Sequence, residues 1–261
     1  MPIEAIETRR LYRQIADQIA RLIQQGEYLP ATRLPSERDL AQQLGVSRPS
    51  VREALIALEI AGFVEVRTGS GIYVCQPENA GTLLPDDIAE PGPFELVAAR
   101  RMIEGENCAI AAIAARDYDL YRIAETIDMM VQEFNEKSNA FDADRLFHIR
   151  IAEATGNSAL AHVVHNLWEM RRGPMYRQFE SHFDTSERHS QAIEEHSLIL
   201  AALRQRDPEA ARAAMHAHLD AVKAAFALTL DGSAADSPAL VADDKATPRE
   251  SAKKRSAIQA K

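Results

Sequence analysis

The segment Leu34–Val74, LPSERDLAQQLGVSRPSVREALIALEIAGFVEVRTGSGIYV, decides the fold of the N-terminal part of the chain. Ser36 suits the N-cap of a first helix, and Gly45 tolerates the left-handed conformation that commonly ends one. Ser47 caps a second helix, with Pro49 in its first turn, where the missing N–H costs nothing. The pattern therefore predicts two short helices joined by a tight turn.

The second of these helices has two different faces. One face is apolar and repeats at helical spacing through Val51, Ala54, Leu55 and Leu58. Arg48 and Arg52 are four residues apart and are expected to project together from the opposite side. Two short β-prone runs follow, Phe63–Val66 and Ile72–Cys75, around a glycine-bearing turn. We interpret the segment as a winged helix-turn-helix, because a plain helical hairpin with solvated arginines would explain neither the caps nor the wing.

The motif PSERDLAQQLGVSRPSVREALIALE, followed by GFVEVRTGSG, resembles the DNA-binding domain of GntR-family bacterial regulators from about Leu11 to Val74. In such a fold the recognition helix presents its N-terminal side chains to base edges in the major groove. The resemblance implies that Gly69 lies at the wing tip, where a side chain would obstruct the approach to the minor groove. The residues that we expect to contact DNA are Arg38, Ser47, Arg48, Arg52 and Gly69.

Length and composition indicate two domains in a reduced, cytoplasmic protein. The chain has 261 residues, a net charge of −9 and two cysteines. Residues 1–75 carry nine basic and nine acidic side chains, whereas residues 76–230 carry 15 basic and 25 acidic ones. The acidity therefore belongs to the second part of the chain, and the neutral first part can still neutralise phosphates locally. No run approaches the ~18 apolar residues of a membrane span, and the start of the chain has no secretory signal.

The rest of the chain predicts an all-helical domain, so that the fold class is mainly α. We expect the winged helix-turn-helix at 1–75, a linker at 76–93 rich in Pro, Gly and acidic residues, and a disordered tail at 231–261. Residues 94–230 have helical periodicity throughout and predict a helical bundle. The expected helices are 94–115, 118–136, 141–155, 158–180, 185–206 and 208–230.

A metal site is the first candidate in this domain. Asp144 and His148 are four residues apart and share one face of a helix, while His196 and His218 lie on the last two expected helices. Imidazole nitrogens with one carboxylate suit zinc, nickel, manganese or iron. From spacing alone, however, satisfied or exposed histidines explain the pattern better than a metal does.

The motif DRLFHIRIAEATGNSAL resembles the metal-containing version of the FadR-type effector domain, the FCD domain. In that family the Asp and His of D-x-x-x-H and two later histidines hold the ion, and Asp144, His148, His196 and His218 occupy those positions. The resemblance thus implies a divalent metal ion, with zinc the first choice. The remaining histidines that we considered match no ligand position and are taken as structural or surface residues, with His182 a weak candidate for a pocket contact: His162, His165, His182, His189 and His216.

The stretches PGPFELVAAR, AEATGNSAL, LWEMRRGPMY and SHFD resemble the regulators of hexuronate utilisation. The resemblance implies a cavity with Arg100, Trp168 and Arg171 as effector-binding residues. An arginine beside a metal can clamp a carboxylate, and an aromatic ring suits the apolar face of a sugar. The alternatives are a salt bridge from Arg100 to Glu104, core packing of Trp168 and a surface ion pair of Arg171.

These features predict a homodimeric transcriptional regulator that acts as a repressor, binds a palindromic operator and releases it when a sugar acid binds. Lactate or gluconate is an alternative effector for the same site. Two other classes of protein remain as alternatives, a metal-dependent enzyme with an appended DNA-binding domain and a structural DNA binder without a ligand response. The sequence supplies no additional general base for an enzyme, so we do not expect catalysis. Because no apolar run is long enough to span a membrane, we do not expect a membrane association either.

Overall fold

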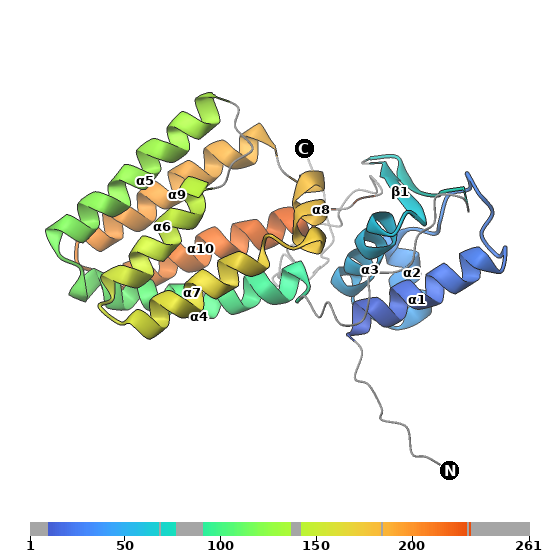
Figure 1. Cartoon of the computed structure of the whole chain (residues 1–261), viewed down its shortest axis with the longest axis horizontal. Helices are drawn as coiled ribbons and strands as arrows, with labels where there is room; N and C mark the ends of the chain where they lie inside the picture. The colour runs from blue at the N-terminus through green and yellow to red at the C-terminus, as the bar shows by residue number, and fades with distance from the viewer. Residues whose placement is uncertain are drawn as a thin grey trace, which may run out of the picture.

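The computed structural model describes residues 10–67, 69–76, 91–136, 142–183, 185–228 and 230. They form an N-terminal lobe and a helical bundle that lie side by side (Figure 1). The linker expected within 76–93 and the tail expected at 231–261 fall almost entirely outside the described residues. The N-terminal lobe contains α1 (Leu11–Gln24), α2 (Glu37–Leu44), α3 (Arg48–Ile60), β1 (Val64–Arg67) and β2 (Gly71–Val74).

The lobe is a winged helix-turn-helix, as predicted. The Ser36 side chain accepts a hydrogen bond from Asp39 N at the start of α2, and the Ser47 side chain accepts one from Ser50 N at the start of α3. Gly45 has φ +67° and ends α2 in the left-handed conformation. Strands β1 and β2 pair antiparallel and form the wing. Local capping chemistry therefore determines where the two helices begin and where the turn between them lies.

The bundle contains seven helices among the described residues. They are α4 (Pro93–Ala114), α5 (Asp117–Asn135), α6 (Asp142–Ala154), α7 (Ser158–Met170), α8 (Pro174–Phe183), α9 (Ser186–Arg204) and α10 (Pro208–Phe226). Helix α4 packs along α10, and α5 packs against α6 and α9. None of the described helices is both long enough and apolar enough to cross a membrane.

The single helix expected at 158–180 is wrong, because the chain forms α7 and α8 there. Helix α7 ends at Met170, and α8 begins at Pro174, immediately after Gly173. Proline lacks a backbone N–H and is tolerated in the first turn of a helix but not in its interior. The Gly173-Pro174 pair therefore separates two helices, and α8 turns toward the N-terminal lobe (Figure 1).

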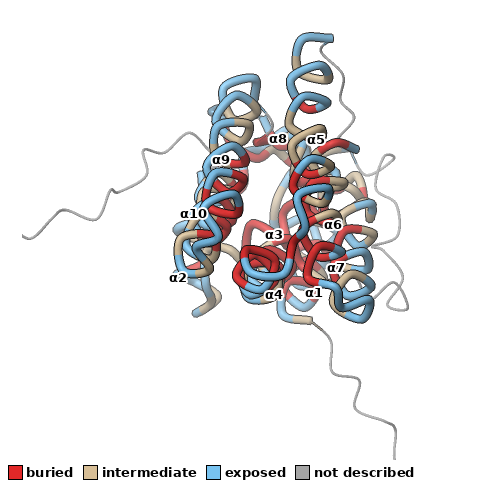
Figure 2. Tube along the Cα trace, turned by 90° about the vertical axis from the view of Figure 1, so that its left-hand side faces the viewer, coloured by how far each residue is buried: buried red, intermediate tan, exposed pale blue. Residues whose placement is uncertain are grey.

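The buried residues form two large hydrophobic clusters, which appear as the red stretches of the tube in Figure 2. One cluster fills the middle of the bundle around Phe147, Ile199 and Leu203. The other begins in the N-terminal lobe and continues without a break into Phe179 of α8 and Phe226 of α10. Because this second cluster is shared, the lobe is docked on the bundle through a buried apolar contact.

Candidate functional site

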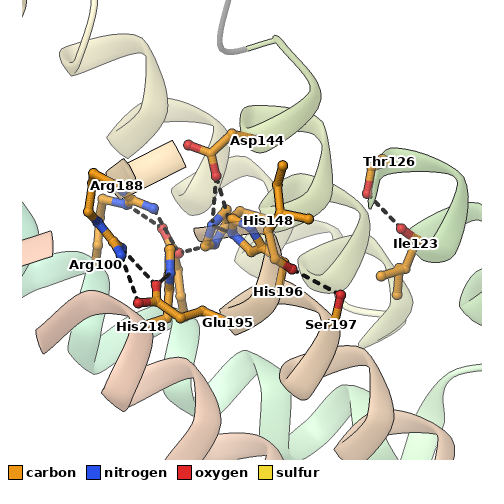
Figure 3. Close-up of polar contacts among 12 residues, drawn as sticks. Arg100, Ile123, Thr126, Asp144, His148, Arg188, Glu195, His196, Ser197 and His218 are labelled. Atoms are coloured by element: carbon orange, nitrogen blue, oxygen red, sulfur yellow. Dashed lines mark hydrogen bonds and ion pairs between the residues drawn. The ribbon is translucent and has the colours of Figure 1, made fainter. Parts of the chain in front are cut away.

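Four side chains converge inside the bundle, as Figure 3 shows. Asp144 and His148 come from α6, His196 from α9 and His218 from α10. One ligand-type atom from each of the four lies within 4.8 Å of all the others. Asp144 Oδ1 is 3.4 Å from His148 Nε2 and 3.3 Å from His196 Nε2. The structure thus brings together all four residues that the resemblance marked as metal ligands.

Carboxylates behind two of the imidazoles orient them. His148 Nδ1 lies 2.5 Å from Glu104 Oε2, and His218 Nδ1 lies 2.7 Å from Glu195 Oε2. The hydrogen bond with Glu195 leaves the other nitrogen of His218, Nε2, to face the centre of the cluster, whereas the Glu104 contact of His148 is an ion pair. Arg188 Nη2 binds the same oxygen of Glu195 at 2.7 Å, which fixes that carboxylate in turn. Nothing in the sequence marks Glu195 as part of the site, because only the tertiary structure brings it next to His218.

The protonation states also suit a cation. Burial lowers the pKa of His218 to about 3, helped by the neighbouring His196, and burial lowers the pKa of His196. Both imidazoles are therefore neutral near pH 7. Burial opposes ionisation of Asp144, but the imidazoles of His148 and His196 and the nearby Arg171 outweigh it and hold the pKa of this carboxyl well below its usual range. Burial lowers the pKa of His148, but the carboxylates of Glu104 and Asp144 outweigh it and raise this pKa, so a bound cation would have to displace the proton of that imidazole. The cluster accordingly offers a carboxylate and two neutral imidazoles.

The donor set fits a divalent transition metal. Asp144 Oδ1 is buried and has no hydrogen-bond partner among the described residues, although two imidazole nitrogens point at it. Three nitrogens and one carboxylate oxygen match the ligands that zinc and neighbouring first-row metals take in proteins. A cation at the centre of the cluster would satisfy this oxygen and the imidazole lone pairs together.

A cavity of about 120 Å³ adjoins the cluster. Asp144, His196 and His218 contribute to its wall. Helix α8 and the end of α10 also contribute to the wall, with Tyr176 and Phe226 among the lining residues. The cavity is therefore lined by both polar and apolar side chains.

Two of the three predicted effector residues line this cavity. Arg100 does so while its guanidinium pairs with Glu104 at 2.8 Å, so the salt bridge and the position at the cavity occur together. Arg171 also lines it and binds Asp144 Oδ2 at 3.1 Å and Glu180 Oε1 at 2.7 Å. These arginines carry charge that an anionic ligand would meet.

The expectation that Trp168 lines the cavity is wrong. Its side chain is buried among Ile149, Ala152 and Val164, which is the core packing given as the alternative. The indole ring lies between two guanidiniums, with the Arg100 Cζ 4.2 Å and the Arg171 Cζ 4.1 Å from the ring centroid. Trp168 thus positions the two arginines by cation–π contacts from behind the cavity wall.

Two other histidines differ from their expected roles. His189, taken as a structural or surface residue, contributes to the cavity wall. His182, a weak candidate for the cavity, instead lies with its Nε2 2.6 Å from Glu59 Oε2 on α3. Neither position could be read from the sequence, because both depend on how α8 and α9 pack.

The expected DNA-contacting residues divide into an exposed group and one buried residue. Arg38 and Ser47 are exposed, Arg48 is part-exposed, and Gly69 is exposed at the wing turn with φ +76°. Arg67, which stacks on Tyr73 of the wing, adds an exposed cation that the sequence analysis did not single out. Their exposure leaves these groups accessible for the DNA contacts that the sequence predicts.

The expectation that Arg52 projects beside Arg48 is wrong. Its side chain is 2% exposed and pairs with Glu37, with Nε 2.8 Å from Oε1. Arg52 Nη1 also donates to the main-chain oxygen of Phe226 at 2.6 Å. The bundle covers the middle of α3, so the solvent-facing side inferred from the helix alone becomes an interior side.

This architecture defines a class: a winged-helix DNA-binding lobe joined to a helical domain with a ligand-type cavity. Comparison with protein families finds "Bacterial regulatory proteins, gntR family" over residues 11–74 and "FCD domain" over residues 95–221. The chain belongs to the GntR family of transcriptional regulators and has an FCD domain, as the sequence analysis expected. It is therefore a DNA-binding transcriptional regulator and not an enzyme.

Curated relatives are similar over most of their length. The Uxu operon transcriptional regulator of Escherichia coli K12 is 38% identical over 84% of this chain and 88% of its own. The Exu regulon transcriptional regulator of the same strain is 39% identical over 85% and 86%. A putative L-lactate dehydrogenase operon regulatory protein, also from E. coli K12, is 31% identical over 82% and 85%. Among solved structures, Streptococcus agalactiae GntR has a TM-score of 0.45 and 24% identity, over 82% of this chain and 99% of that one.

Proposed function

We propose that this protein is a repressor whose FCD domain binds a hexuronate or a close derivative and then releases operator DNA. The observation that carries the proposal is a metal-type cluster and two arginines in one cavity, Arg100 and Arg171 beside Asp144. The similarity to regulators named for Uxu and Exu operons supports a hexuronate as the first candidate. The 31% identity to a lactate-operon regulator makes lactate the second.

The chemistry of the cavity suits a hydroxylated acid. A divalent ion held by Asp144, His148, His196 and His218 would supply a Lewis acid for an oxygen of the ligand. Arg100 gives two of its five N–H donors to Glu104, and a guanidinium fork with donors to spare suits a carboxylate.

Other groups of the cavity match the rest of a sugar acid. Sugar hydroxyls need acceptors as well as donors, and Glu133 and Glu180 line the same cavity. The rings of Tyr176, Phe183 and Phe226 offer an apolar wall to the C–H face of a sugar. A ligand with one carboxylate and several hydroxyls uses all of these groups, whereas lactate leaves most of them without a partner.

The proposed regulator acts as a homodimer on a palindromic operator. An exposed apolar strip on α4 supports a subunit contact there. Met102 and Ile113 are each 72% exposed, and Ile110 is 42% exposed, at spacings that put them on one side of the helix. Light scattering after gel filtration should give twice the chain mass, and Met102→Glu with Ile113→Glu should shift it toward one chain mass.

The test uses fluorescence anisotropy of a labelled DNA fragment from upstream of this protein's reading frame. The metal-loaded protein is mixed with glucuronate, galacturonate, fructuronate, gluconate or lactate, and calorimetry records the binding of each acid separately. Release by a hexuronate, abolished by a chelator or by His196→Ala, is the expected result. Tight operator binding that no acid weakens contradicts the hexuronate proposal. If a sugar acid instead increases operator affinity, the proposed release of DNA on ligand binding is wrong.

A further inference from the structure

The recognition helix α3 has two working surfaces. Its first turn, with Arg48, is the part that faces DNA in a winged helix. Its middle faces the bundle through Arg52, Glu53 and Glu59, on one continuous docking surface. This second surface contacts the bundle and positions α3 relative to it.

Two neighbouring residues of this surface bind opposite ends of two bundle helices. Arg52 donates to the Phe226 carbonyl, at the last residue of α10, and Glu53 Oε1 accepts from Phe94 N at 3.2 Å, in the first turn of α4. Helix ends leave such carbonyls and N–H groups without intrahelical partners. The helix dipole favours a cation at the C-terminus and an anion at the N-terminus, as found here. Adjacent side chains of α3 therefore satisfy both helix ends at once.

Helix α8 supplies the third contact. Glu59 Oε2 lies 2.6 Å from His182 Nε2 and accepts from Gln178 Nε2 at 3.0 Å. In Figure 1, α8 stands between the bundle and the N-terminal lobe. The same short helix carries Tyr176, Glu180 and Phe183 on the cavity wall. One side of α8 therefore faces the cavity and the other holds the recognition helix.

Phe226 joins the two surfaces within a single residue. Its ring lines the cavity and packs edge-on against Tyr176 and Phe179, at centroid distances of 5.6 and 5.0 Å. Its carbonyl oxygen holds Arg52. A ligand that displaces this ring moves the atom that positions α3, because side chain and carbonyl share one Cα. Phe226 therefore contacts both the cavity and the recognition helix.

We propose that occupancy of the cavity reaches the operator through this docking surface, with the last turn of α10 and helix α8 as the moving parts. This inference rests on the proposed function only in taking a sugar acid as the ligand that fills the cavity. It requires that the ligand favour one arrangement of Phe226 and α8 over another, since a ligand without differential affinity shifts no equilibrium. Signal transfer then does not depend on the linker that joins the two parts in sequence.

The first arm of the test breaks the docking surface and leaves the cavity intact. Glu53→Ala and His182→Phe are made singly and together in the full-length, metal-loaded protein, because Arg52→Ala would leave Glu37 buried without its main partner and endanger folding. Operator Kd is measured by anisotropy with and without galacturonate or glucuronate. The ratio of the two values, expected at 5- to 150-fold in the wild type, should fall below about 3-fold in the double variant.

Two controls make the first arm specific. Glu106→Ala removes an exposed ion pair with Arg212 elsewhere on α4 and should leave the ratio unchanged. Coupling between two ligands is reciprocal, so the effect of operator DNA on the Kd of the sugar acid must fall by the same factor in the double variant. A double variant that keeps the wild-type ratio overturns the proposal.

The second arm needs no sugar acid. Ala225 lines the cavity next to Phe226, and Ala225→Trp puts a bulky side chain there as a built-in occupant. We expect operator affinity to fall at least 5-fold in this variant, and Glu53→Ala with His182→Phe in the same chain should remove most of that fall. Thermal unfolding confirms that each variant is folded. If no sugar acid changes the operator affinity of the wild type, the proposed function is wrong, but the Ala225→Trp experiment still tests the docking surface. Unchanged operator affinity in Ala225→Trp would show that the docking surface does not transmit occupancy of the cavity.

Discussion

Arg171 donates from Nη1 to Oδ2 of Asp144 at 3.1 Å, so a cavity arginine also holds a carboxylate of the metal-type cluster. The other oxygen of Asp144 faces His148 and His196. The second Arg171 nitrogen, Nη2, binds Glu180 of α8. Through this one side chain, the cluster is connected both to the ligand cavity and to the helix that holds α3.

Arg171→Ala should weaken metal binding about 10- to 100-fold, the usual effect of removing a partner that orients a ligand. The reason is that Asp144 would lose the donor that fixes its orientation. Competition with a zinc-sensitive dye measures the change. Arg172→Ala, which removes an exposed pair with Glu169, is the matched control and should leave zinc affinity unchanged. Equal effects of the two substitutions would contradict the orienting role.

Zinc should stabilise the protein against unfolding, since the four ligands come together only in the folded chain. At a free concentration 100 times the Kd, the gain is about 2.7 kcal/mol. Thermal unfolding with and without zinc records it, and the gain should vanish in His196→Ala. Trp168 is the single tryptophan, and its ring lies 5.0 Å from that of His148, so its fluorescence reports binding directly. A transition midpoint that zinc leaves in place would argue against the site.

Arg48→Ala should cost about 1–3 kcal/mol of operator binding if Arg48 reads a base, with a smaller loss on random DNA. Its side chain is 39% exposed at the start of α3, within reach of a groove. Anisotropy with operator and with scrambled DNA separates the two effects. Equal losses on both would identify Arg48 as a phosphate anchor instead.

Arg52→Ala should act mainly on stability, in contrast to Arg48→Ala. Glu37 is fully buried, and removing its main partner from the interior typically costs about 3–5 kcal/mol. Chemical denaturation measures this loss. The substitution Arg52→Lys keeps the charge but not the fork that bridges Glu37 and the Phe226 carbonyl, so it should recover only part of the stability. Full stability in Arg52→Ala would contradict the buried pairing.

Glu53 should make the docked fold sensitive to pH. Burial raises the pKa of Glu53 to about 7, and the charge of Glu95 acts in the same direction. The hydrogen bond from Phe94 N and the charge of Arg10 lower this pKa, but they do not outweigh burial. In the unfolded chain this carboxyl titrates near 4.5. The raised pKa therefore contributes to the free energy of unfolding in full below pH 4.5, and this contribution is lost as the pH rises through 7. The contribution is at most about 3 kcal/mol.

Glu53→Gln tests this sign, because glutamine resembles the protonated acid at every pH. Relative to the wild type, the variant should gain stability between pH 5.5 and pH 8. Urea unfolding at both values measures the difference. A gap between the two proteins that does not change with pH would show that the Glu53 carboxyl titrates normally in the folded protein.

Local sequence determined the winged helix and half of the metal-type cluster. Ser36, Gly45 and Ser47 fix helix ends through bonds within a few residues, so their positions follow from residue type alone. Asp144 and His148 share a helix face because they are four residues apart. The histidines of α9 and α10 could be linked to them only through the family resemblance, since nothing local relates residues 196 and 218 to residue 144.

Tertiary structure alone decided which exposed-looking side chains became interior ones. Arg52 has the helical position of a solvent-facing arginine, yet α10 and α2 cover it. Trp168 stacks behind the cavity and His189 lines it, because α7 and α9 pack in orientations that helical periodicity does not encode. Periodicity specifies one buried side for a helix in isolation. The second partner that a helix meets depends on contacts between residues far apart in the chain, and those form only when the bundle and the winged lobe pack together.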